Sequence, residues 1–210
     1  MKPIVKIALI LLGAVLLAVL LRIFAIGSYA VTFAGLEPTL YKGERILVNK
    51  WDYGQVKRGD LIVFHDPSEK DGKILIGKVM AQPGDVIYMD HDFCFTTAVN
   101  LRDTLPAQPI MIPLKGVETP VRPWNAILLC NTLVLHEHKE AEVKDDNLLV
   151  DGKPVTHWTF SKNYYWVMTD NDSLLTDSRS FGFVPEDCLI GKPLCIWFTH
   201  EWNRLWKKVE

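Results

Sequence analysis

The chain has 210 residues and a formal net charge of −2, with 49% hydrophobic and 23% charged residues. This composition is that of a globular protein and excludes a disordered or collagen-like chain. The first 30 residues carry Lys2, Lys6 and Arg22 and no acidic residue, which leaves 20 basic and 25 acidic residues for the other 180. A mildly acidic body without a basic run excludes phosphate-dominated nucleic-acid binding, so we predict no nucleic-acid partner.

The N-terminal segment predicts a single membrane helix. Residues 7–21 are uninterrupted apolar sequence, and the apolar stretch continues to residue 26 with Arg22 near its end. Twenty helical residues span about 30 Å, which matches the hydrocarbon core of a bilayer. Lys2 and Lys6 favour a cytoplasmic location for the N-terminal residues 1–6. A membrane helix of residues 7–26 then places the body outside the cytoplasm. A cleavable signal peptide ending at Ser28-Tyr29-Ala30 is the alternative, and it also exports the body.

Beyond residue 26 the sequence predicts a mainly β fold with antiparallel sheets. Short β-branched or aromatic runs alternate with turn residues, and helical periodicity is nearly absent. Asp151-Gly152 predicts a two-residue hairpin, because a type I′ turn needs positive φ at both positions. Pro83-Gly84-Asp85 predicts a turn. The predicted strands are residues 45–50, 60–64, 73–80, 86–89, 126–135, 147–150, 164–168 and 195–198.

The body is expected to consist of a β core and an inserted lobe. Residues 27–85 and 161–210 form the expected core, and residues 86–160 form the lobe. Prolines are concentrated in residues 91–125, which predicts a loop-rich stretch. The tail combines Trp202 and Trp206 with basic residues. Its sequence is compatible with a membrane interface and equally with a packed C-terminal strand.

The cysteines and histidines give no strong metal or redox signal. Cys94, Cys130, Cys188 and Cys195 allow three disulfide pairings in an exported body, but none has C-x-x-C spacing. We expect Cys188 and Cys195 to be buried thiols or one bridge. His136-Glu137-His138 has no evident third ligand, so we interpret it as a solvated edge strand. No metal or cofactor is predicted.

Four sequence blocks follow the apolar segment. They are EPTL at 37–40 with GERILVNK at 43–50, RGDLIVF at 58–64, KVMAQPGD at 78–85, and DNDSLLTDSR at 170–179 with GFVP at 182–185. Their order resembles type I signal peptidase, the bacterial Ser/Lys leader peptidase, over most of the chain. The resemblance implies an anchored β fold at the bacterial inner membrane that cleaves signal peptides from proteins leaving the Sec translocon. The signature residues are Pro38, Thr39, Gly84, Asp85, Asp170, Asn171, Asp177, Ser178 and Arg179.

The catalytic positions of that family do not match this sequence. The resemblance places the nucleophilic serine at Gly35 and the general-base lysine at Gly77, with Lys78 in the place of the following arginine. The serine that helps form the oxyanion hole falls at Phe33, and the serine that supports the base falls at Leu175. Glycine supplies neither a nucleophile nor a base. Neighbouring strand residues point to opposite faces, so Lys78 is a weak substitute.

The sequence therefore predicts a membrane-anchored binding or scaffold protein linked to signal-peptide processing or export. Its expected partners are the membrane, signal peptides, an active signal peptidase and the Sec translocon. An active peptidase that uses Lys78 and a displaced hydroxyl is the alternative, although Thr32 and Thr39 lie far from position 35. A third hypothesis is a structural module whose cleft is filled by Phe33 and Leu175.

The retained signature residues are expected to stabilise the frame. Asp177 and Arg179 lie two residues apart on one face and are expected to form a charge-assisted pair that supports the cleft floor. Several glycines in the blocks are expected in turn conformations that disfavour a Cβ. These are Gly43, Gly59, Gly84 and Gly182.

Overall fold

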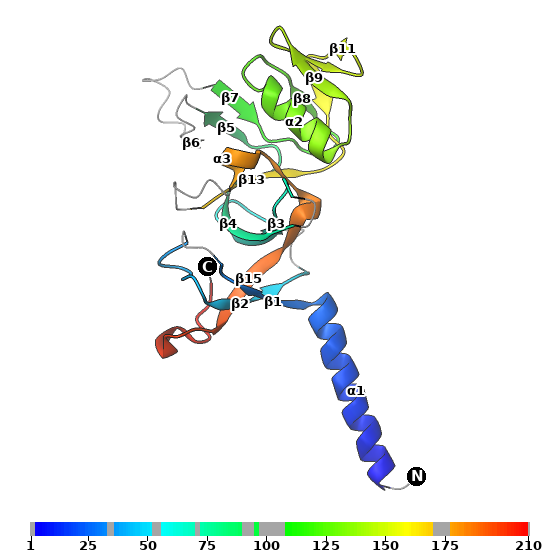
Figure 1. The fold of residues 1–210 in the computed structure, drawn as a ribbon, viewed down its shortest axis with the longest axis vertical. Coiled ribbons are helices and arrows are strands. Elements are labelled where there is room, and N and C mark those ends of the chain that lie inside the picture. The colour runs from blue at the N-terminus through cyan, green and yellow to red at the C-terminus, as the bar shows by residue number, and fades with distance from the viewer. Residues whose placement is uncertain are drawn as a thin grey trace. The chain divides into compact units, whose positions relative to one another are not determined.

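The computed structural model describes residues 3–32, 36–51, 56–69, 72–89, 95–96, 108–169 and 177–209 (Figure 1). The chain divides into two compact units. Residues 1–55 and 190–210 form one, which we call the terminal unit, and residues 56–189 form the other, which we call the central unit. The expected inserted lobe, residues 86–160, falls within the central unit, and its separation from a core stays a prediction.

The terminal unit consists of a helix and a three-stranded antiparallel sheet. Helix α1 (Pro3–Phe24) runs almost directly into β1 (Ile26–Ala30), which pairs with β2 (Arg45–Asn49). Strand β2 pairs on its other side with β15 (Leu189–Phe198). The predicted strands at 45–50 and 195–198 are confirmed. Among the described residues, no helix combines the length and apolar character needed to cross a membrane.

The C-terminal tail folds back on the sheet. After β15 the chain forms a 3₁₀ turn at Trp202–Arg204. The main chain then returns beside the strand, where Ile196 N donates to Lys207 O at 3.0 Å and Cys195 bridges Lys208. The sequence left open a membrane interface or a packed C-terminal strand. In the structure the tail packs against the sheet, through an isolated bridge and not as a full strand.

The central unit contains a four-stranded antiparallel sheet and several short ladders. Strand β4 (Ile74–Ala81) pairs with β3 (Leu61–His65) and with β13 (Tyr164–Met168), and β13 pairs with β14 (Val184–Pro185). The hairpin at Asp151-Gly152 is confirmed, because both residues have positive φ, 51° and 74°. In the first short ladder, β5 (Val86–Met89) lies between β6 (Phe95–Thr96) and β7 (Gln108–Met111). In the second, β8 (Glu118–Pro120) pairs with β12 (His157–Thr159). In the third, β10 (Asn147–Val150) lies between β9 (Ala141–Lys144) and β11 (Lys153–Pro154).

The strand predicted at residues 126–135 is wrong, because this segment is helix α2 (Ala126–His136). Its buried apolar residues Ala126, Leu129, Cys130 and Leu133 recur with helical spacing, and they pack into the core of the central unit. The helical period is not evident in the sequence, because the exposed residues of α2 are also largely apolar. Helix α2 packs beside β9 and β10.

The interpretation of residues 136–138 as a solvated edge strand is also wrong. His136 is buried at the end of α2, and His138 has a positive φ of 53° just after it. The Glu137 carboxylate accepts hydrogen bonds from Ser161 N at 3.1 Å and from the Tyr164 hydroxyl at 3.0 Å. The segment therefore closes the helix and ties it to β13. No group of three metal-ligating side chains occurs in the described part of the chain.

The cysteines of the described residues are free thiols. Cys130 is buried, whereas Cys188 and Cys195 are half-buried. The single bridge considered for Cys188 and Cys195 is therefore wrong. Burial, with Asp187 nearby, raises the pKa of Cys188 to about 11, so this thiol is a poor nucleophile at neutral pH. Cys94 lies outside the described residues.

Candidate functional site

The structure describes only part of the predicted site. Gly35, Asp170 and Asn171 lie outside the described residues, as do Phe33 and Leu175. The described site residues fall into four groups: Gly77 and Lys78 on β4, Gly84 with Asp85 in the turn after β4, the block that begins at Asp177, and Pro38 with Thr39. Pro38 and Thr39 belong to the terminal unit, and the other three groups belong to the central unit.

Gly77, at the general-base position, is buried on β4 opposite Ile62 of β3. A Cβ at this position would lie 2.6 Å from Val167 Cγ1 and 3.1 Å from the carbonyl oxygen of Met168. The first distance is shorter than any carbon–carbon van der Waals contact. The space that a side chain at position 77 would need is therefore already filled by β13.

Lys78 points away from that space. It is exposed, while Gly77 and Val79 on either side are buried. Ladder pairing of β4 with β3 is regular here, with Lys78 opposite Leu61. The register shift on β4 falls at Met80, between the pairs Val79–Val167 and Ala81–Trp166. The predicted change of face is confirmed, because no bulge lies at Lys78 to reverse it.

Alanine in place of Gly77 is expected to destabilise the central unit by about 1–3 kcal/mol, because its methyl group overlaps Val167. The free energy of unfolding in urea measures this loss. Val167→Ala, which removes the overlapping methyl, is expected to cost about 1–3 kcal/mol alone through a cavity. In the double variant the losses should be clearly less than additive. Additive losses would contradict the overlap.

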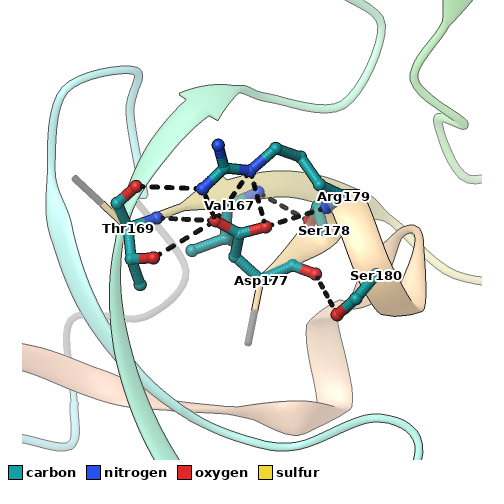
Figure 2. Close-up of polar contacts among 6 residues, drawn as sticks. All are labelled: Val167, Thr169, Asp177, Ser178, Arg179 and Ser180. Atoms are coloured by element: carbon teal, nitrogen blue, oxygen red, sulfur yellow. Dashed lines mark hydrogen bonds and ion pairs between the residues drawn. The ribbon is translucent and has the colours of Figure 1, made fainter. Parts of the chain in front are cut away.

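Asp177 organises the start of helix α3 (Ser178–Phe181) (Figure 2). Its carboxylate accepts a hydrogen bond from Arg179 N at 3.0 Å, and Arg179 Nη2 donates to Asp177 Oδ2 at 2.7 Å. Thr169 donates to Oδ2 through its main-chain N at 3.0 Å and its hydroxyl at 3.2 Å. The predicted charge pair is confirmed, at a helix N-terminus, which itself favours an anion.

The Asp177 carboxylate is an ionised structural group. Its side chain is fully buried, and that of Arg179 is 11% exposed. Burial raises the pKa of Asp177, but hydrogen bonds from the Arg179 side chain and from the main chains of Thr169 and Arg179 outweigh burial and hold the pKa below its ordinary value of 3.8. Asp177 thus accepts hydrogen bonds and does not serve as an acid at neutral pH.

Ser178 connects this block to Gly77. Its side chain is buried, and Val167 N donates to Ser178 Oγ at 2.9 Å. Val167 is the residue that fills the space beside Gly77. The Asp177–Arg179 block therefore holds β13 in the position that excludes a side chain at position 77.

A cavity of about 680 Å³ lies between α2 and α3. Ile127, Leu128 and Asn131 of α2 line one side, and Ser180 and Phe181 of α3 line another. The hydroxyl of Ser180 donates to Asp177 O at 3.0 Å. No lysine or histidine is present among the described residues of the lining. The described residues of the lining thus present mainly apolar surface, together with the polar side chains of α3 and Asn131.

Gly84 and Asp85 form the predicted turn. Gly84 has φ +88°, which disfavours a side chain, and Asp85 accepts from Gln82 N at 3.0 Å. Arg58 Nη2 lies 3.2 Å from Asp85 Oδ2. These signature residues therefore stabilise the end of β4. The other predicted turn glycines, Gly43, Gly59 and Gly182, also have positive φ.

Pro38 and Thr39 are held by an ion pair that sequence reasoning missed. Arg204 donates to Thr39 O at 2.9 Å and Pro38 O at 3.3 Å, and its Nε lies 2.7 Å from Glu44 Oε1. Both partners are buried, and Glu44 also accepts from Tyr41 N at 2.9 Å. Glu44 lies within the first block, but its partner is 160 residues away, so no sequence spacing indicates the pair.

The chain resembles known proteins over nearly all of its length. Residues 4–198 match the family described as "Signal peptidase, peptidase S26". Signal peptidase I T of Bacillus subtilis (strain 168) is 32% identical over 190 residues, which cover 88% of this chain and 80% of that protein. Signal peptidase I of Buchnera aphidicola subsp. Schizaphis graminum is 28% identical, covering 87% and 71%. Signal peptidase I of Pseudomonas fluorescens is 26% identical, covering 87% and 68%.

Proposed function

This chain belongs to the signal peptidase family S26, and from that membership we propose that it is a membrane-anchored member that binds signal-peptide segments of exported proteins without cleaving them. Signal-peptide processing is the activity that the names of its relatives indicate. The missing catalytic groups set this chain apart from an enzyme of that kind. An active signal peptidase or the Sec translocon is the partner that such a role requires.

The surroundings of Gly77 carry the proposal. Acyl transfer by a Ser/Lys pair needs a lysine amine at the cleft floor that is desolvated enough to act as a base. Here the position has no side chain, and Val167 occupies the volume that one would need. The loss of the base is therefore supported by the packing around Gly77 as well as by the sequence motif that places the base at this position.

Lys78 does not replace the missing base. It is exposed on the other face of β4, where water surrounds its amine. The sequence also has glycine at position 35, so the hydroxyl nucleophile of the family is absent as well. A peptidase with displaced residues is the second candidate, and the 32% identity to Signal peptidase I T of Bacillus subtilis favours it.

We further propose that α1 anchors the chain in the inner membrane with its N-terminus in the cytoplasm. The apolar run of residues 7–26 and the flanking Lys2 and Lys6 support this orientation. Large apolar side chains of α1 are exposed, which is unfavourable in water. They are Ile7, Ile10, Leu11, Leu12, Val15, Leu16, Leu17 and Val19.

Cleavage and binding assays on the detergent-purified full chain test the proposed function. A fluorescent leader peptide is expected to bind, seen as increased anisotropy, and to remain uncut. Signal peptidase I T of Bacillus subtilis serves as the cleaving control. Turnover that disappears in Lys78→Ala but persists in Lys73→Ala, another exposed lysine at β4, would establish the displaced-residue peptidase instead. Absence of both turnover and binding would contradict both candidates.

A further inference from the structure

Helix α2 exposes a stripe of apolar side chains. Ile127 is 66% exposed, Leu135 49% and Val134 44%, although the other face of α2 packs into the core of the central unit. Leu128 is half-buried beside them, and Asn131 is the exposed polar residue at the centre. We call these five residues the α2 stripe. Apolar side chains that are exposed together mark a surface at which another molecule binds.

The α2 stripe is symmetric about Asn131. Leu128 and Val134 lie three residues before and after it, and Ile127 and Leu135 lie four residues before and after it. Residues three and four apart share one face of a helix. A half turn about an axis through Asn131, perpendicular to α2, therefore exchanges Ile127 with Leu135 and Leu128 with Val134. Each apolar side chain would then meet an apolar side chain of a second copy, which is the condition for a two-fold contact.

The charges around the α2 stripe also suit a second copy. Helix α2 contains no aspartate, glutamate, lysine or arginine, and its last residue, His136, is buried. Residues 122–125 carry a net charge of +1 from Arg122, whereas residues 137–140 carry −1 from two glutamates and one lysine. Antiparallel pairing brings the positive end of one helix to the negative end of the other. A lipid surface fits less well, since helices that lie on membranes carry lysine and arginine along a polar face.

The cavity beside the stripe offers room for side chains of a second helix. Ile127, Asn131 and Leu135 line the cavity of about 680 Å³ between α2 and α3, and Phe181 of α3 lines it as well. Helices associate when the side-chain ridge of one fits a groove of the other. Residues 127, 131 and 135, spaced by four, form such a ridge on α2. In a two-fold pair, the ridge of each copy would lie along the groove of the other.

We propose that α2 is a homodimer interface, at which two copies of this chain pack their α2 stripes antiparallel about a two-fold axis at Asn131. The two Asn131 amides meet at the centre, where each can donate to and accept from the other, and a polar pair of this kind fixes the register. The 11 residues of α2 span about 16 Å, so the contact is smaller than the roughly 800 Å² per partner of a standard interface. The dimer is therefore weak and reversible, and it does not depend on the proposed signal-peptide binding.

Sedimentation equilibrium of the detergent-purified full chain tests the dimer. Ile127→Glu and Leu135→Lys each place a charge opposite an apolar side chain, so each variant alone should raise the dissociation constant about tenfold or more. An equimolar mixture of the two should dimerise again, because the introduced charges face each other on one side of the axis and the unchanged apolar residues meet on the other. Val117→Glu, at an apolar residue 38% exposed outside α2, is the control expected to change nothing.

Cysteine bridges test the register of the pair. Asn131→Cys chains should form a disulfide-linked dimer on mild oxidation, because the axis brings the two copies of this residue together. Leu135→Cys is the matched control. Four residues from the axis correspond to about 6 Å along the helix, so its two copies lie about 12 Å apart, beyond the reach of a disulfide. Bridging is measured relative to the unchanged chain, which has free cysteines of its own.

The outcomes separate this interface from other modes of association. A chain that stays monomeric at every concentration overturns the inference, and so does a dimer that both charge variants leave equally strong, as one held through α1 would be. A mixture that does not dimerise, or equal bridging at positions 131 and 135, overturns the antiparallel two-fold arrangement. A glutamate in the first turn and a lysine in the last turn suit the helix dipole, so the charge variants should keep the thermal unfolding midpoint of the unchanged chain, which checks that they are folded. The leader-peptide assays are independent of these results.

Discussion

Asp177→Ala is expected to lower the free energy of unfolding of the central unit by about 3–5 kcal/mol, the usual loss when one partner of a buried ion pair is removed. The substitution removes the acceptor for the Arg179 guanidinium and for both donors of Thr169, and it also removes the N-cap of α3. The Arg179 charge then remains largely buried without its carboxylate. Urea denaturation of the detergent-solubilised chain measures the loss.

An exposed ion pair in the same unit provides the matched control. Lys162 Nζ lies 2.7 Å from Asp187 Oδ2, as close as the Arg179–Asp177 pair, but the Asp187 side chain is 56% exposed. Asp187→Ala should therefore lower stability by less than about 1 kcal/mol. Equal losses for Asp177→Ala and Asp187→Ala would contradict the view that burial makes the first pair important.

The effect of Asp177→Ala should also depend on pH. The pKa of Asp177 in the folded chain is below its ordinary value of 3.8, so its stabilising contribution is complete above that pH. As pH falls below 3.8 the unfolded chain takes up the proton first, and the contribution is lost as pH reaches the lowered pKa. The difference in stability between the unchanged chain and Asp177→Ala should shrink over this acid range. A constant difference would show that the charge does not matter.

The sheet of this protein could largely be read from its sequence, because its strands alternate with clear turn residues. The strands at 86–89, 147–150 and 164–168 have the predicted bounds. Helix α2 could not be read in the same way. Its exposed residues Ile127, Val134 and Leu135 are apolar, so the helical period of its buried face does not stand out.

The candidate site, like the fold, could be predicted from the sequence only in part. The sequence alone indicates that position 77 lacks a lysine, but only the packing of Val167 against Gly77 shows that the space is filled. The Asp177–Arg179 pair is local in sequence and was predictable. The Glu44–Arg204 pair was not, since it joins residues from opposite ends of the chain that only the folded sheet brings together.

Arg204→Ala is expected to lower the stability of the terminal unit by about 3–5 kcal/mol, because it leaves the buried Glu44 carboxylate without its cation. Two main-chain carbonyls, those of Pro38 and Thr39, also lose their donor. The guanidinium further lies 4.2 Å above the ring of Tyr41. Urea denaturation measures the loss, and Arg58→Ala, which breaks the exposed pair with Asp85, is the control expected to change stability by less than about 1 kcal/mol.

A double-variant cycle separates the pair from its two members. Glu44→Gln keeps an acceptor for Tyr41 N, and Arg204→Met keeps the apolar stem. Because the combined variant no longer buries an unpaired charge, its loss should be smaller than the two single losses together by about 0.5–3 kcal/mol. Hydrogen exchange then locates the effect: in Arg204→Ala the amides of Leu40 and Gly43 should exchange faster, while those of β13 in the central unit should not change. Uniform acceleration across both units would mean that Arg204 supports the whole chain and not specifically the segment that carries Pro38 and Thr39.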